Sequence, residues 1–175
     1  YVSFMLTGSV AGLCVERPDV VLATSPQFFC AVGGWAVAKL RRRPFVFEVR
    51  DLWPESIKAV GAMRQSLLIE ALEKLELFLY DQANGVVVAT EAFRENLRSR
   101  GIDPRKITVV RNDVDLTRYA PRERDTALAR ELGLEGKFVV GYLGTHGMAH
   151  ALHRVVEAAE LVRDDPRLHF LFVGG

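Results

Sequence analysis

The sequence contains little cysteine, and its two cysteines show no metal-binding spacing. Cys14 and Cys30 both lie in apolar surroundings, far apart in the chain. A disulfide-rich secreted domain or a zinc site built on a Cys-x2-Cys pair is therefore not indicated. We expect both thiols to be buried and reduced, with a disulfide or a metal site as the less favoured alternative. This expectation points to the cytoplasm.

An excess of either charge is also missing, since 23 basic and 22 acidic residues leave a formal net charge of +1. Such a balance gives no electrostatic basis for nucleic acid as a partner. The composition, 49% hydrophobic and 26% charged, is that of a globular protein and not of a disordered one.

A long hydrophobic run is absent as well. The apolar stretch 28–40 is shorter than the roughly 18 residues that a membrane-spanning helix needs. Arg41, Arg42 and Arg43 follow it, which favours a buried helix with a solvated C-terminal end. The alternative is a peripheral membrane contact at the inner membrane face, because basic charge beside apolar surface suits anionic lipid headgroups.

What the sequence does contain is a regular alternation of short apolar runs and longer amphipathic stretches. Strands are predicted at 20–23, 45–49, 86–89, 107–111, 138–143 and 168–173, and helices at 27–41, 66–82, 91–100, 126–131 and 152–163. The strands are short and almost entirely apolar, which is typical of parallel strands buried on both faces. This order predicts an α/β fold with Rossmann-like parallel sheets.

One change of composition divides the chain. Residues 118–136 lose the apolar runs and are rich in Arg, Glu and Pro, which predicts a linker. We expect an N-terminal domain at 1–117 and the start of a second domain at 137–175, a piece too small to be stable by itself. The chain begins without Met and stops at Gly175, directly after a strand-like run. We therefore expect further residues on both sides in the complete protein, and self-association through the sheet edge after Val173.

Polar residues and glycines follow the predicted strands, where parallel sheets bind their ligands. These strand-end residues are Ser25, Arg50, Asp51, Trp53, Thr90, Asn112, Asp115, Gly144, Thr145 and Gly147. They predict a cleft without identifying a reaction.

The glycines after the strand at 138–143 let the backbone approach a phosphate at a helix N-terminus, although an ordinary tight turn explains them equally well. The run is neither a P-loop nor the dinucleotide pattern, which disfavours a dehydrogenase.

The most distinctive local feature is Arg50-Asp51-Leu52-Trp53-Pro54. Its arginine can bind phosphate or carboxylate, its aspartate can accept sugar hydroxyls, and its indole can stack on a sugar. The alternative is a structural ion pair with Trp53 filling the core. His146, His150 and His153 have helical spacing but no acidic ligand beside them, so we expect no metal site.

Five motifs in order resemble a known family. They are Arg-Pro-Asp-Val-Val at 17–21, Phe-Glu-Val-Arg-Asp-Leu-Trp-Pro at 47–54, Gly-Val-Val-Val-Ala-Thr at 85–90, Asn-Asp-Val-Asp at 112–115 and Gly-Tyr-Leu-Gly-Thr-His-Gly-Met-Ala at 141–149. Together they resemble the group 1 (family 4) glycosyltransferases, and among these the fucosamine-transferase-like branch of bacterial surface-polysaccharide synthesis.

The resemblance implies a GT-B fold, in which two Rossmann-like domains bind acceptor and nucleotide sugar. It implies a retaining hexosyltransferase-type enzyme without a metal or other cofactor, acting on a UDP-sugar and a lipid-linked or saccharide acceptor. By position, Gly144, Thr145 and Gly147 would lie near the donor phosphates, and Asp51 and Arg50 would touch the transferred sugar or the acceptor. Ser25, Trp53, Thr90, Asn112 and Asp115 would line the acceptor side or the cleft.

Some residues depart from the family pattern. Asp113 replaces a usual glycine, Arg50 replaces a usual histidine, and the Glu-x7-Glu region that holds the donor would lie beyond Gly175. We therefore expect this chain to be inactive by itself and the complete protein to be an enzyme. A non-catalytic sugar-nucleotide-binding module and a GT-B sugar-nucleotide epimerase are the alternatives.

Overall fold

The computed structural model describes residues 2–25, 28–53 and 67–175. The chain divides into two compact units, Tyr1–Asp113 and Val114–Gly175, and each is considered by itself. The division falls inside the Asn-Asp-Val-Asp motif at 112–115. Three positions of the sequence predictions, Gln27, Pro54 and Ser66, lie outside the described residues.

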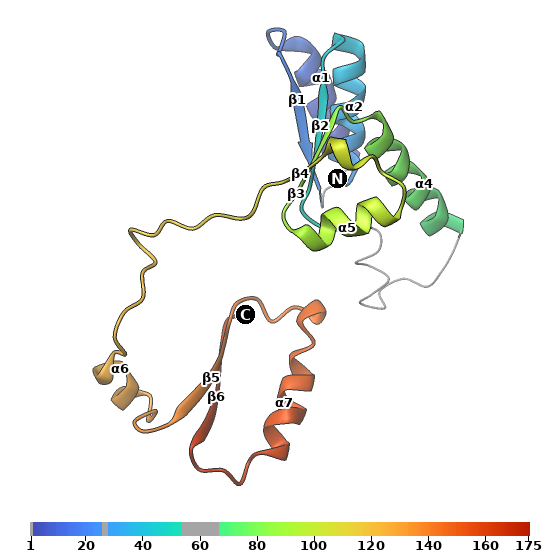
Figure 1. Ribbon diagram of the computed structural model, residues 1–175. Coiled ribbons are helices and arrows are strands. Elements are labelled where there is room, and N and C mark those ends of the chain that lie inside the picture. Colours follow the sequence, from blue (N-terminus) through green and yellow to red (C-terminus); the bar gives the residue numbers. More distant parts are fainter. Residues whose placement is uncertain (1, 26–27, 54–66) are drawn as a thin grey trace. The chain divides into compact units, whose positions relative to one another are not determined.

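The first unit is built on a four-stranded parallel sheet with the strand order β1-β2-β3-β4 (Figure 1). The strands are β1 (Val21–Thr24), β2 (Phe45–Val49), β3 (Gly85–Val88) and β4 (Ile107–Val109). Helices α2 (Phe28–Arg41), α4 (Leu67–Gln82) and α5 (Glu91–Ser99), and the 3-10 turn η1 (Pro104–Lys106), stand between them. The predicted α/β class with Rossmann-like parallel sheets is confirmed.

Helices α2 and α4 pack on the same face of this sheet. Phe47 of β2 stacks on Tyr80 of α4 with ring centroids 5.3 Å apart. Gly34 of α2 lies so close to β1 that a Cβ on it would meet the Cβ of Ala23 at 2.6 Å. Because successive parallel strands are neighbours, crossovers of one hand place their helices on one side.

The expectation that the strands are buried on both faces is therefore wrong for the described structure. In β2, Phe45, Phe47 and Val49 are buried, whereas Val46 and Glu48 are only half-buried. Coverage of one face produces this alternation.

The predicted elements agree with the observed ones to within one or two residues at their ends. The largest differences are at β4, which ends at Val109 and not at 111, and at α7 (Leu152–Leu161), which was expected to reach 163. Helix ends fray and often finish in a turn, and Val162 accordingly has a non-helical backbone, with φ −117° and ψ 14°.

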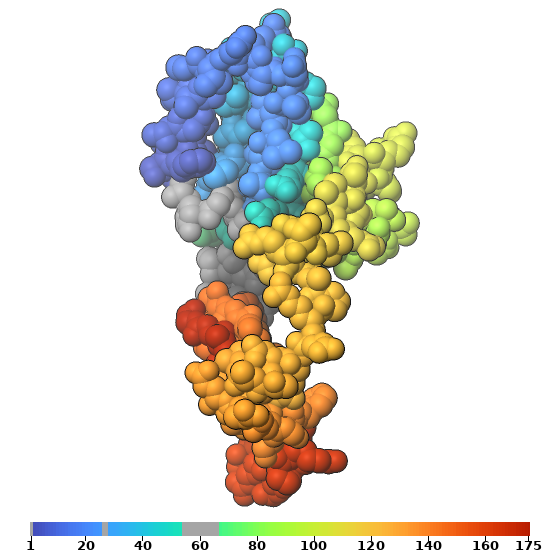
Figure 2. Space-filling view, turned by 90° about the vertical axis from the view of Figure 1, so that its left-hand side faces the viewer, coloured from blue at the N-terminus to red at the C-terminus, as the bar shows by residue number. Residues whose placement is uncertain are grey.

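Helix α1 (Val2–Cys14) was not predicted. It contains no charged residue, and many of its apolar side chains are exposed. Small residues let it approach α2 closely: a Cβ on Gly33 would lie 2.7 Å from Ser9 Oγ, and one on Gly12 would lie 3.3 Å from Val37. In Figure 2, α1 (darkest blue) forms part of the surface of the first unit. Cys14, expected to be buried, is exposed, and both cysteines are free.

A buried carboxylate joins α4 to α5. Glu76 is 1% exposed, accepts from Tyr80 Oη at 2.7 Å, and forms an ion pair with Arg100 at 2.5 Å. A carboxylate removed from water needs such partners.

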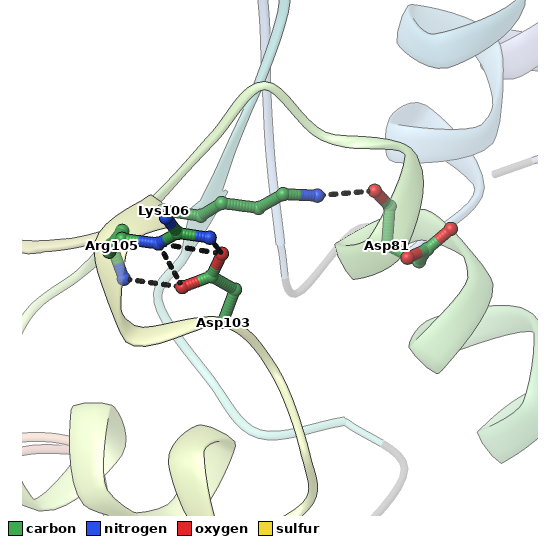
Figure 3. Close-up of polar contacts among 4 residues, drawn as sticks. All are labelled: Asp81, Asp103, Arg105 and Lys106. Atoms are coloured by element: carbon green, nitrogen blue, oxygen red, sulfur yellow. Dashed lines mark hydrogen bonds and ion pairs between the residues drawn. The ribbon is translucent and has the colours of Figure 1, made fainter.

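Two further contacts lie around η1 (Figure 3). Lys106 Nζ donates to the main-chain oxygen of Asp81 at 2.7 Å, which joins η1 to the end of α4. Arg105 donates to both carboxylate oxygens of Asp103, and these hydrogen bonds lower the Asp103 pKa to about 2.

The second unit contains α6 (Thr126–Glu131), β5 (Phe138–Leu143), the 3-10 turn η2 (Met148–His150), α7 and β6 (Leu168–Val173). Strands β5 and β6 pair in parallel. Among the described residues of this unit, only Ala129 and Leu134 are buried. Two strands and two helices bury too little apolar surface for a substantial core. In the described part of the whole chain, no helix is both long and apolar enough to cross a membrane.

Candidate functional site

The carboxyl ends of β1, β2, β3 and β4 lie at one edge of the first sheet. The register pairs Thr24 with Glu48, Val49 with Val88, and Val88 with Val109. The residues that follow these strands therefore meet at the same edge, as expected for parallel strands. Gly144 follows β5, which belongs to the separate two-stranded sheet of the second unit.

Ser25 connects the end of β1 to the turn that follows β2. Its Oγ accepts from the main-chain N–H of Arg50 at 3.0 Å and, at a longer 3.4 Å, from that of Asp51. The same hydroxyl donates to the main-chain oxygen of Asp51 at 3.3 Å. Ser25 is 2% exposed, so its hydroxyl is used inside the protein. It fixes the backbone from which two candidate side chains project.

The side chains of Arg50 and Asp51 differ from that of Trp53 in their exposure to solvent. Arg50 and Asp51 are exposed, and the described contacts include no ion pair between them. Trp53 is half-buried and stacks on Phe28 of α2, with ring centroids 4.7 Å apart and an interplanar angle of 27°. The indole is thus one wall of the turn, while the charged pair faces solvent and can meet a ligand.

The other strand-end residues of the first unit follow β3 and β4. Thr90 follows β3 and caps α5, its side-chain oxygen accepting from Phe93 N at 3.2 Å. This bond satisfies one of the free N–H groups at the start of the helix. Asn112 is exposed beyond β4. Thr90 therefore has a structural task already, whereas Asn112 has none among the described contacts.

Asp115 belongs to the second unit and makes a compact turn. Its carboxylate accepts from Thr117 Oγ1 at 2.6 Å and from Thr117 N at 2.9 Å. These hydrogen bonds hold the pKa of Asp115 below its ordinary value. A carboxylate already bound this way sets the path of the chain after the division between the units.

The glycine turn after β5 is held by side chains of its own unit. Gly144 has φ +154°, and its N–H donates to Val173 O at 2.9 Å. Tyr142 Oη donates to Thr145 O at 2.8 Å. His150 Nδ1 lies 2.8 Å from Tyr142 Oη and 2.6 Å from Thr145 O. A proton on Nδ1 can be donated to Thr145 O, so this tautomer fits the turn.

The position of Gly174, beside Gly144 of this turn, leaves no room for a side chain. A Cβ on Gly174, which follows β6, would meet Gly144 O at 1.8 Å. The ends of β5 and β6 can approach each other this closely only without a side chain there.

A pocket of about 350 Å³ lies between this turn and α7. His146, Gly147, His153 and Phe172 are among its lining residues. This volume suits a small ligand or part of a larger one. The glycine turn therefore adjoins a hollow that can take a ligand group. Gly147 lines this hollow, and Gly144 and Thr145 come just before it in the chain.

The helical spacing of His146, His150 and His153 does not correspond to one helix in the structure. His146 precedes η2, His150 ends it, and His153 is in α7. Over the described residues, no cluster of three or more His, Cys, Asp or Glu side chains could hold a metal ion.

Sequence reasoning missed the supporting roles of Tyr142 and His150. The only signal available was the polar tyrosine in an otherwise apolar strand, followed by a histidine after the glycines. Neither residue type reveals a bond to a main-chain oxygen without the geometry of the turn.

Comparison with known proteins shows several likenesses. Residues 4–113 match the family described as glycosyl transferase 4-like domain. A putative colanic acid biosynthesis glycosyl transferase of Escherichia coli is 26% identical over 168 residues, which is 90% of this chain and 40% of that protein. A D-inositol 3-phosphate glycosyltransferase of Rhodococcus opacus is 40% identical over 94 residues, covering 51% of this chain and 21% of that protein.

A solved structure resembles the chain in fold. Anabaena HepE, in a crystal structure with UDP and glucose, matches 97% of this chain and 42% of its own, with a TM-score of 0.71 and 16% identity. The predicted GT-B type of α/β fold is thereby confirmed. The chain spans about 40% of the length of the E. coli relative.

Proposed function

Because the chain belongs to the glycosyl transferase 4-like domain family, we propose that it is part of a retaining, hexosyltransferase-type glycosyltransferase. The complete protein moves a sugar from a UDP-sugar to a lipid-linked or saccharide acceptor in polysaccharide synthesis, within the fucosamine-transferase-like branch. It uses no metal ion or other cofactor. This chain, as one part of that protein, does not transfer sugar by itself.

The observation that carries the proposal is the exposed charged pair on a fixed backbone. Ser25 holds the main chain of Arg50 and Asp51, while both charged side chains stay exposed. A carboxylate accepts hydrogen bonds from sugar hydroxyls, and a guanidinium binds phosphate or carboxylate oxygens. Groups held in place before the ligand arrives can stabilise charge as it develops in a reaction.

The second unit supplies the donor side of the proposal. The turn at Gly144, Thr145 and Gly147 adjoins the pocket that His146 and His153 line. The bonds of Tyr142 and His150 to Thr145 O fix this turn. Glycines permit a close approach of phosphate oxygens to main-chain N–H groups. The relative bound to UDP and glucose supports a nucleotide sugar as the ligand.

The acceptor side includes a contact with the inner membrane face. Helix α1 exposes Phe4, Leu6 and Val10, with exposed fractions of 63%, 58% and 62%, and carries no charge. Apolar surface of this kind suits the boundary between lipid headgroups and acyl chains. This supports work at a membrane surface and a lipid-linked acceptor. The location that we propose is the cytoplasmic side of that membrane.

The test is sugar transfer by the full-length protein that contains this chain. UDP binding is measured by calorimetry, and transfer is measured with UDP-sugars and a lipid-linked acceptor. We expect Asp51→Asn and Arg50→Ala to lower turnover about tenfold or more, the effect of losing one hydrogen bond to a charged group. The urea midpoint of unfolding should stay unchanged, because both side chains are exposed.

Asp164→Asn is the matched control, since it makes the same chemical change at a side chain that is 97% exposed. Failure of the full-length protein to bind any common nucleoside diphosphate would refute the transferase. Binding of UDP without transfer would favour the non-catalytic binding module. Unfolding of the Asp51 or Arg50 variant would assign these residues to structure instead.

A further inference from the structure

A second pocket lies at the opposite edge of the first sheet, where the strands begin. Trp35 and Lys39 of α2, Arg42 and Arg43 just after it, Gln82 at the end of α4, and Asn84 before β3 line a volume of about 460 Å³. We call these six residues the basic pocket. Its size is that of sites for small organic ligands.

The charge of the basic pocket is entirely positive. Lys39, Arg42 and Arg43 are cationic, and no carboxylate is among the residues that line it. Asp19 forms an ion pair with Arg43, with Asp19 Oδ1 4.0 Å from Arg43 Nη2, and the Asp19 side chain is fully exposed. A second carboxylate lies at the border of the pocket, since Asp81 Oδ2 accepts from Gln82 Nε2 at 3.2 Å. The three cations outnumber these two carboxylates, and the excess of positive charge favours an anion.

One guanidinium in this pocket has a buried nitrogen that lacks an acceptor. Arg43 Nε is inaccessible to solvent and has no hydrogen-bond partner in the described part of the protein. The side chain as a whole is 28% exposed. A buried donor without an acceptor is unfavourable. The exposed part of the same guanidinium is what an anion in the pocket can meet.

Arg42 has a backbone conformation that glycine adopts more easily than arginine. Arg42 has φ +54°. Its N–H donates to Lys39 O at 3.2 Å, and the N–H of Arg43 donates to Ala38 O at 2.9 Å. These two bonds form the usual helix ending in which the left-handed residue is glycine. An arginine there is less favourable than glycine by about 1 kcal/mol or more, so the fold alone does not call for it.

The polar wall of the pocket offers a further donor. Asn84 Oδ1 accepts from Phe45 N at 2.9 Å, which orients the amide and leaves its NH₂ group available to another acceptor. Trp35 adds an aromatic surface, with its ring set edge-on to Phe78 at 5.2 Å. The pocket thus combines cations, amides and an indole.

We propose that the basic pocket binds a phosphate-bearing ligand through Lys39, Arg42 and Arg43. Phosphate oxygens are the acceptors that guanidinium and ammonium groups bind most readily in pairs or clusters. The phosphate can belong to a soluble metabolite or to a lipid headgroup. The pocket lies at the amino edge of the sheet, so the inference does not depend on the proposed sugar transfer at the carboxyl edge.

The test uses Arg42→Gly, which removes the cation while relieving the backbone. Calorimetry measures the binding of pyrophosphate to the full-length protein that contains this chain. Cosedimentation measures the binding of the same protein to vesicles with and without phosphatidylglycerol. We expect Arg42→Gly to weaken binding of at least one probe about tenfold, the effect of one lost hydrogen bond between charged groups. Its unfolding midpoint should be unchanged or higher. Lys39→Gln, at an exposed helix position, should weaken binding in the same assay.

Arg98→Ala is the charge control, because Arg98 is an exposed arginine on α5 paired only with Glu95 in the described contacts. Loss of pyrophosphate binding in both pocket variants, with the control unchanged, supports a soluble phosphate ligand. Loss confined to phosphatidylglycerol vesicles supports a lipid headgroup. The proposal is overturned if wild type binds neither probe, if both pocket variants bind as wild type does, or if Arg98→Ala weakens binding equally.

Discussion

Replacing Ser25 with alanine tests whether its hydroxyl holds the turn after β2. The hydroxyl accepts one good hydrogen bond, from Arg50 N at 3.0 Å, and makes two longer contacts with Asp51, at 3.3 and 3.4 Å. An ordinary hydrogen bond contributes about 1 kcal/mol, and a buried N–H left without an acceptor adds a penalty. Since the longer contacts weaken with distance, we expect the free energy of unfolding to fall by about 1–2 kcal/mol.

Urea unfolding, followed by tryptophan fluorescence, measures this change in the first structural unit, which contains Ser25. Both tryptophans of the sequence, Trp35 and Trp53, belong to the first unit. With a denaturant slope of about 1.5 kcal/mol per molar urea, the midpoint should fall by about 1 M. Ser99→Ala is the control, because among the described residues the partner of Ser99 Oγ is Asn96 O, within the same helix. The reasoning is refuted if the Ser25 variant stays within about 0.2 M of wild type, or if the control shifts equally.

Two further predictions concern stability. Glu76→Ala should lower the free energy of unfolding by about 2–3 kcal/mol, because it leaves the partly buried Arg100 without its carboxylate. Breaking a fully buried ion pair costs about 3–5 kcal/mol. A circular dichroism melt that matches wild type would contradict this. Hydrogen bonds with Arg105 lower the pKa of Asp103 from 3.8 to about 2. The stability that this carboxylate contributes is therefore complete above the ordinary pKa and is lost as the pH falls towards 2. Asp103→Asn should therefore flatten the acid limb of the stability curve at low salt, and an unchanged limb would exclude this carboxylate as a cause.

The strands and most helices could be predicted because each has its own local signal. The apolar run at Phe45–Val49 and the leucines of α4 carry their periodicity in neighbouring residues. Helix α1 has no such signal, because thirteen residues without a charge have no polar face to set against an apolar one. The pattern also could not show that one face of the sheet is less covered, since that depends on strand order.

The candidate site was predictable in position but not in construction. Arg50 and Asp51 could be recognised because they end an apolar strand. The role of Ser25 depends on a partner 25 residues away in the chain, and that pairing exists only once Thr24 stands opposite Glu48. Trp53 could be read either as a ligand-stacking ring or as packing, and its contact with Phe28 became visible only in three dimensions.

The way Ser25 holds its turn also bears on how this site can change during evolution. The hydroxyl bonds to main-chain N–H and C=O groups at positions 50 and 51, which nearly every amino acid carries. Substitutions at these two positions can therefore alter the chemistry presented to a ligand while the turn keeps its path. Because one buried serine fixes the main chain, the side chains at these positions can change among relatives. Specificity can then diverge while the loop keeps its conformation.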